Sequence, residues 1–175
     1  AEELALTATA DAVRDQLVAR TGLEIGVVYD RLNRRKIDLI PLPEWADPPK
    51  ARIGELLAAV ERHLRDAGLP GGLGEAVILA ERLAREHGLP DARCTTDVKH
   101  IEIGLTDRSD ARAWLARELL EPERIAWRDV LIGGDEFGPI AGFAGSDDLL
   151  RDDDEAVVVS VGPEPNGVPA GIIHL

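Results

Sequence analysis

The sequence predicts an α/β protein in two parts, with an antiparallel sheet in residues 1–95 and a parallel sheet in residues 96–175. In the first part, two stretches of alternating apolar and polar residues flank a short turn and lie among helical patterns. In the second part, short apolar runs that end in glycine follow a helical segment. Such runs are typical of buried strands in a parallel sheet.

The first part begins with a predicted helix over residues 10–21, with Thr9 as its N-cap and Gly22 just past its end. Alternating apolar side chains then predict two antiparallel strands within residues 23–40, joined by a turn around Asn33.

That turn carries a basic cluster, which stands out in an acidic chain. Because the guanidinium fork suits phosphate and carboxylate groups, the cluster is a secondary candidate for binding an anionic substrate. The alternative is a solvated hairpin end whose charges discourage pairing with another strand. The residues concerned are Arg31, Arg34, Arg35 and Lys36.

A proline-rich connector around Trp45 follows, and then apolar residues at helical spacing predict a helix from Ile53 to Leu64. Residues 76–84 predict a further helix, with a strand over 77–79 as the alternative. Residues 92–105 predict one long strand or a hairpin that opens the parallel part of the fold.

In the second part, Ser109 is the expected N-cap of a helix that reaches Leu119. Strands are expected at residues 129–132 and 156–161, and the acidic run 151–155 between them is expected to be a solvated turn. A Pro/Gly-rich loop leads to a last apolar run.

The strand at 129–132 ends in two glycines, and the acidic pair Asp135-Glu136 comes directly after them. A glycine-rich loop then leads to a second acidic pair, Asp147-Asp148. Ligands of open α/β sheets bind just past the carboxyl ends of strands. Carboxylates at that place are candidate ligands for Mg²⁺, which prefers oxygen. The alternative is a strand followed by a solvated turn.

Composition limits the possible partners. The 175 residues carry a formal net charge of −13, which argues against nucleic-acid binding and against an anionic membrane surface. Cys94 is the single cysteine, so an internal disulfide is excluded and a cytoplasmic location is expected. The chain begins without Met and ends in an apolar run, which fits either a segment of a longer chain or a chain from which residues were dropped.

Three segments in order resemble the haloacid dehalogenase superfamily, and among its members the large-capped sugar-phosphate phosphatases and phosphomannomutases. They are HIEIGLTDRSDARAWLARELL, DVLIGGDEFGPIAGFAGSDDLL and AVVVSVG. The resemblance covers residues 95–175 directly, and residues 1–94 only as a cap by order and size. It implies part of a Rossmann-like core with a parallel sheet, and an α/β cap that contains the antiparallel sheet.

The resemblance also implies roles for particular residues. Arg108 takes the place of a basic residue, usually lysine, that offsets charge at the transferring phosphoryl group. Asp135 matches the acid that anchors Mg²⁺, and Asp147 matches the later acid of the same motif, here reached through a longer glycine-rich spacing. Glu136 and Asp148 are secondary candidates for substrate binding. The alternative for Arg108 is a helix-entry residue paired with a neighbouring acid, Asp107 or Asp110.

The family's nucleophile lies in an Asp-x-Asp-Gly motif, and the 175 residues contain no such motif. The expected function is a Mg²⁺-dependent phosphatase that hydrolyses a phosphorylated sugar or similar small metabolite through an aspartyl-phosphate. Two alternatives stay open: a non-catalytic fragment of this fold that binds a ligand or partner, and a phosphomutase.

Overall fold

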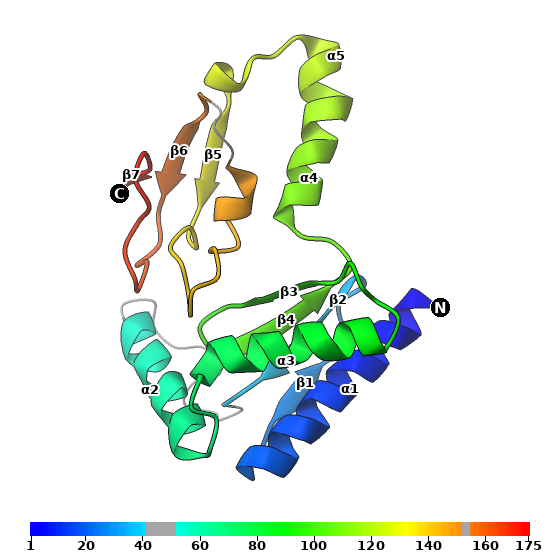
Figure 1. The fold of residues 1–175 in the computed structure, drawn as a ribbon. Helices are drawn as coiled ribbons and strands as arrows, with labels where there is room; N and C mark the ends of the chain where they lie inside the picture. The colour runs from blue at the N-terminus through cyan, green and yellow to red at the C-terminus, as the bar shows by residue number, and fades with distance from the viewer. Residues whose placement is uncertain (41–51, 152–154) are drawn as a thin grey trace. The chain divides into compact units, whose positions relative to one another are not determined.

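A computed structural model of the chain describes residues 1–40, 52–151 and 155–175 (Figure 1). The chain divides into two compact units. Unit 1 comprises Ala1–Thr106 with Ala141–Phe143, and unit 2 comprises Asp107–Ile140 with Ala144–Leu175. The division falls further along the chain than the boundary expected at residue 95. The predicted proline-rich connector and most of the acidic run 151–155 lie outside the described residues.

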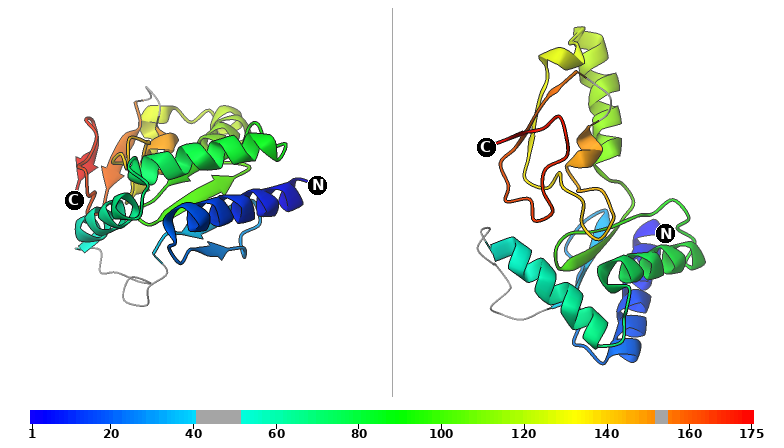
Figure 2. Two further views of the ribbon diagram at one scale, coloured as in Figure 1. Left: turned by 60° about the horizontal axis from the view of Figure 1, so that its bottom comes forward. Right: turned by 60° about the vertical axis from the view of Figure 1, so that its left-hand side comes forward.

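Unit 1 is a four-stranded antiparallel sheet with helices on one face (Figures 1 and 2). The strand order is β1-β2-β4-β3; helix α1 packs on β1 and β2, α3 packs on β3 and β4, and α2 packs on α3. The elements are α1 (Glu2–Thr21), β1 (Gly26–Val28), β2 (Arg34–Asp38), α2 (Ile53–Asp66), α3 (Gly72–Glu86), β3 (Arg93–Thr96) and β4 (His100–Gly104).

The predicted hairpin within residues 23–40 is confirmed, since Gly26 pairs with Asp38 across an antiparallel ladder. The helix predicted from Ile53 is confirmed as α2, and the helical alternative for residues 76–84 is confirmed as part of α3. Residues 92–105 form a hairpin, the second of the two expected forms.

One strand was assigned to the wrong sheet. We expected the strand within 92–105 to open the parallel part of the fold, but β4 lies between β2 and β3 in the antiparallel sheet. Its side chains explain the placement: Ile101 and Ile103 are fully buried, while His100 and Glu102 on the other face are only partly covered. Such alternation is typical of a strand with one face on the core and the other polar.

The predicted N-cap Thr9 is also wrong, because α1 begins at Glu2. Thr9 is buried inside the helix, where its hydroxyl donates to the Ala5 carbonyl at 2.8 Å. The buried stripe of α1 contains Leu6 and Ala10 as well as Val13 and Leu17. Alanine is small, so the alanines in the first turns of α1 weaken the apolar pattern there. The pattern therefore predicted a helix start that is too late.

The sheet face opposite the helices carries an ion-pair network centred on the β3–β4 turn. The Asp97 carboxylate accepts the backbone N–H of Lys99 at 2.9 Å and of His100 at 2.8 Å, and it contacts the His100 ring at 2.8 Å. The Lys36 ammonium lies 3.4 Å from the same carboxylate. Burial alone would raise the pKa of Asp97, but the hydrogen bond and charge of His100, followed by Lys36 and the Lys99 N–H, lower the pKa to about 2.

This depressed pKa predicts a pH-dependent contribution to stability. The shift from the ordinary value of 3.8 to about 2 corresponds to about 2 kcal/mol of unfolding free energy. The contribution is present above pH 3.8 and is lost as the pH falls toward 2. Urea unfolding should therefore show Asp97→Asn less stable than the wild type by about 2 kcal/mol at pH 7, with the difference shrinking below pH 4. A difference that does not depend on pH would contradict the assignment.

Unit 2 contains a three-stranded parallel sheet in the order β5-β6-β7, as the sequence predicted for this part of the chain. Its long helical segment begins as α4, passes through a π-helical turn, η3, and ends in α5. The elements are α4 (Arg108–Leu115), η3 (Ala116–Leu120), α5 (Glu121–Glu123), η4 (Trp127–Asp129), β5 (Leu131–Gly134), η5 (Asp148–Leu150), β6 (Val157–Ser160) and β7 (Ile173–His174).

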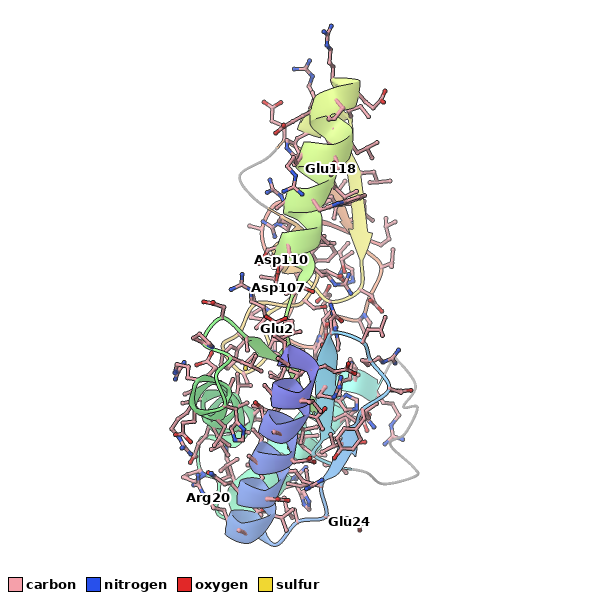
Figure 3. The ribbon with its side chains drawn as sticks, turned by 90° about the vertical axis from the view of Figure 1, so that its right-hand side faces the viewer. Glu2, Arg20, Glu24, Asp107, Asp110 and Glu118 are labelled. Carbon is pink, nitrogen blue, oxygen red and sulfur yellow. The ribbon has the colours of Figure 1, made fainter. Side chains whose placement is uncertain are left out.

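Helix α4 begins two residues earlier than predicted. Asp107, rather than Ser109, is the N-cap, and it forms a capping box in which the Asp110 carboxylate accepts the Asp107 N–H at 2.9 Å. Figure 3 labels both acids at the first turn of this helix. The chain is therefore mixed α/β, with one antiparallel and one parallel sheet. Across residues 1–40, 52–151 and 155–175, no helix has the length and apolar character needed to cross a bilayer.

Candidate functional site

The site lies in unit 2, where the chain leaves the carboxyl ends of two parallel strands. Residues 135–147 follow β5 and residues 161–172 follow β6, so both loops start from the same edge of the sheet. Asp135, directly after β5, is exposed, and Glu136 is half-buried. A Cβ atom at Gly162, just past β6, would collide with the Asp135 backbone. Glycine at this position therefore lets the acidic loop pass close to the end of β6.

Asp147, at the end of the acidic loop, binds the backbone at the start of the same loop. Its side chain is buried, and its Oδ2 accepts the backbone N–H groups of Asp135 at 2.8 Å and Glu136 at 2.9 Å. Its own N–H donates to the Glu136 carbonyl at 2.9 Å. A Cβ atom at Gly134 would collide with this carboxylate, so the glycine that ends β5 allows the close approach.

The other oxygen of Asp147 forms an ion pair with Arg108. Arg108 is the first residue of α4, where the positive end of the helix dipole makes a cation unfavourable. The Asp107–Asp110 capping box offsets this cost and fixes the start of the helix. Half of the Arg108 side chain stays accessible, at 45% exposure. The guanidinium is thus tied to the acidic loop on one side and open to solvent on the other.

The partner of Arg108 is therefore an acid from the loop after β5, far along the chain. Asp107 and Asp110, the neighbours considered from the sequence, make the helix cap. The structure thus brings Arg108 and Asp147 together, while the roles that the resemblance implies for them stay predictions. Asp135 joins them through its backbone N–H.

A second buried carboxylate, Glu164, was missed by the sequence analysis. It lies in the loop after β6 and accepts the N–H groups of Phe137 at 2.9 Å and Gly138 at 2.7 Å. The buried Ser160 hydroxyl donates to it at 2.7 Å. A glutamate between two prolines resembles solvated loop sequence. The one signal that could have identified it is its place just after a buried strand of the same sheet.

The secondary acidic candidates have local partners. Glu136 accepts a hydrogen bond from the Ser146 hydroxyl at 2.5 Å. Asp148 pairs with Arg151 at 3.0 Å and lines a hollow of about 340 Å³ between the two loops. Asn166 lines the same hollow, and its amide donates to the Pro139 carbonyl at 2.7 Å. A ring-sized ligand fits a hollow of this volume.

The basic cluster belongs to unit 1 and lies mostly on β2 rather than in the turn. Arg34 pairs with Glu102 of β4 at 2.8 Å, and Arg31 is exposed next to Asp30. Arg35 faces the helices with 3% of its side chain exposed, and its guanidinium bonds to Thr7 and to Glu3 of α1. The predicted role in substrate binding stays a prediction for Arg31 and Arg34, while Arg35 has a structural role.

A metal at this site would depend on few protein ligands. Within the described part of the chain, no three His, Cys, Asp or Glu side chains form a group that could hold a metal ion. Both oxygens of Asp147 are engaged, by Arg108 and by the two backbone N–H groups. The exposed carboxylate after β5 is that of Asp135. Mg²⁺ commonly binds through one or two carboxylates and keeps several waters, so Asp135 fits such a site.

Comparison with known proteins does not assign the chain to a family. No protein-family model matches the chain, and neither the curated proteins nor the solved structures include a significant match. The functional interpretation therefore rests on unit 2 itself and on the resemblance of three segments, the first of which begins with β4 of unit 1.

Proposed function

We propose that unit 2 carries the cation-binding side of a Mg²⁺-dependent phosphatase that acts on a phosphorylated sugar or a similar small metabolite. One observation carries this proposal. The buried Asp147 carboxylate connects the half-exposed Arg108 guanidinium to the loop that presents Asp135 at the carboxyl end of β5. A fixed cation and an exposed carboxylate around one strand end are two of the groups that stabilise charge in phosphoryl transfer.

In this proposal the three residues have different roles. Arg108 binds a phosphoryl oxygen and offsets the charge that develops during transfer. Asp135 holds Mg²⁺, which when bound would neutralise phosphoryl oxygens as a Lewis acid. Asp147, predicted from the sequence as a second metal ligand, instead positions the other two, because both of its oxygens are engaged within the protein.

The nucleophile is not assigned to a residue of this chain. The resemblance implies an aspartate that forms an aspartyl-phosphate, and no Asp-x-Asp-Gly motif occurs among the 175 residues. This observation favours a second candidate function, a module that binds a phosphorylated ligand without turnover. The two functions differ in a single measurable property, the release of phosphate.

The test is phosphate release by the full-length protein from a panel of sugar phosphates, with Mg²⁺ and with EDTA. We expect release that requires Mg²⁺ and is restored when Mg²⁺ is added back after chelation. Binding of a sugar phosphate without release would support the binding module instead. Conversion of a hexose phosphate to its isomer, detected by product analysis, would support a phosphomutase. Release that is unaffected by EDTA would overturn the proposal.

A further inference from the structure

Four consecutive backbone N–H groups of the acidic loop point at two buried carboxylates. Those of Asp135 and Glu136 donate to Asp147, and those of Phe137 and Gly138 donate to Glu164. The four donor–acceptor distances lie between 2.7 and 2.9 Å. We refer to this arrangement, Asp147 and Glu164 with the N–H groups of residues 135–138, as the carboxylate clamp.

The carboxylate clamp changes how the glycine-rich loop is interpreted. Successive N–H groups in a loop after a strand are a common binding site for phosphate. Here the protein's own carboxylates occupy all four donors, so a phosphate group has no backbone donor to bind at residues 135–138. The loop is held as a fixed support for the side chains that it carries.

A glutamate at position 164 costs folding free energy, because its charged side chain is buried and its backbone conformation is strained. It is 4% exposed and its backbone has φ 41°, in the left-handed region that non-glycine residues rarely adopt. Asp147 has Arg108 as a counter-charge, whereas Glu164 has no cationic partner among the residues that the structure describes. Three hydrogen bonds, from the Phe137 and Gly138 N–H groups and the Ser160 hydroxyl, offset this cost.

We propose that Glu164 is a positioning residue for the metal-binding carboxylate of Asp135. Glu164 attaches residues 137 and 138 of the acidic loop to Ser160 at the end of β6. Asp147 attaches residues 135 and 136 to Arg108 at the start of α4. The role rests on the proposed function, because Asp135 is the metal ligand only if that function holds. Loss of Glu164 frees residues 137 and 138, which follow Asp135 by two and three positions, so Asp135 is then held from one side only, by Asp147.

The first measurement reads the clamp itself. In Glu164→Gln, the side-chain amide places an N–H₂ group where Oε1 or Oε2 now accepts a backbone N–H. We expect hydrogen exchange to become faster at whichever of Phe137 and Gly138 faces the new N–H₂ group, while Ile132 of β5 and Val158 of β6 keep their protection. Unchanged exchange at Phe137 and Gly138 would overturn the clamp. The matched control is Glu123→Gln, the same substitution at an exposed position on α5.

The second measurement tests whether Glu164 positions Asp135 for metal binding. Supporting residues of a metal site typically change metal affinity by about 10-fold to 100-fold, so the Mg²⁺ concentration for half-maximal phosphate release should rise by about that factor in Glu164→Gln. Saturating Mg²⁺ should restore most of kcat, an outcome that general destabilisation does not give. Ser160→Ala, which removes one donor to Glu164, provides a milder variant with a smaller change in the same direction.

The two proposals can fail separately. If the wild type releases no phosphate with Mg²⁺, the proposed function fails, and with it the role of Glu164 toward a metal. If the wild type is active but Glu164→Gln and Ser160→Ala have the wild-type Mg²⁺ dependence, the positioning role fails and the function stands.

Discussion

Asp147→Ala is expected to lower the unfolding free energy of unit 2 by about 3–5 kcal/mol, the largest stability effect we predict for this chain, because two backbone donors lose their acceptor. The substitution leaves the N–H groups of Asp135 and Glu136 without their acceptor in a partly buried loop. Each unsatisfied donor costs about 1–3 kcal/mol. The substitution also leaves Arg108 at the start of α4 without its counter-charge.

Asp147→Asn separates these two contributions. Its amide oxygen can still accept both N–H groups, as Oδ2 does now, while its N–H₂ group faces the Arg108 guanidinium and cannot pair with it. Because half of Arg108 is exposed, solvent screens the ion pair, and we expect the Asn variant to lose about 1–2 kcal/mol. Most of the loss in the Ala variant should therefore come from the two backbone donors.

The measurement is urea unfolding followed by tryptophan fluorescence in a Trp45→Phe background, where Trp114 and Trp127 of unit 2 are the remaining fluorophores. Asp148→Asn is the matched control, because its partly exposed pair with Arg151 should contribute less than about 1 kcal/mol. A loss below 1 kcal/mol in Asp147→Ala would show that the carboxylate does not hold the loop.

The fold elements that could be predicted from the sequence are those whose signal is local. The β1–β2 hairpin followed from alternating side chains, and β5 and β6 followed from short apolar runs that end in glycine. The sheet to which β4 belongs depends on pairing with β2, a strand far away in sequence. Local pattern carries no direct information about that partner, although the polar face of β4 favoured the antiparallel sheet.

The candidate site was predictable to a similar degree. Arg108, Asp135 and Asp147 could be found because they match motif positions in order along the chain. The engagement of both Asp147 oxygens depends on the conformation of the loop, in which residues 135 and 147 come together across a glycine-rich stretch. Glu164 acts through backbone N–H groups, which leave no trace in side-chain patterns. The sequence could therefore suggest which acidic residues lie near one another. It could not show which of them accept hydrogen bonds from backbone N–H groups and which are exposed to solvent.

Asp135→Asn is expected to reduce Mg²⁺-dependent phosphate release by about 100-fold or more. A metal contributes several kcal/mol of transition-state charge stabilisation, and about 2.7 kcal/mol corresponds to 100-fold in rate. Asparagine keeps the size of the side chain and an oxygen atom but removes the negative charge. The Asp135 N–H that Asp147 accepts is unchanged by the substitution, so the loop should keep its conformation.

The control for this prediction is Asp129→Asn, the same substitution at an exposed residue just before β5, at the opposite end of the strand. It should keep wild-type activity and wild-type Mg²⁺ dependence. If Asp135→Asn retains activity, Asp135 does not hold the metal and the assignment is wrong. If excess Mg²⁺ restores full activity, Asp135 contributes affinity alone. If activity stays low at saturating Mg²⁺, its negative charge is needed to place the bound metal against the phosphoryl group beside Arg108.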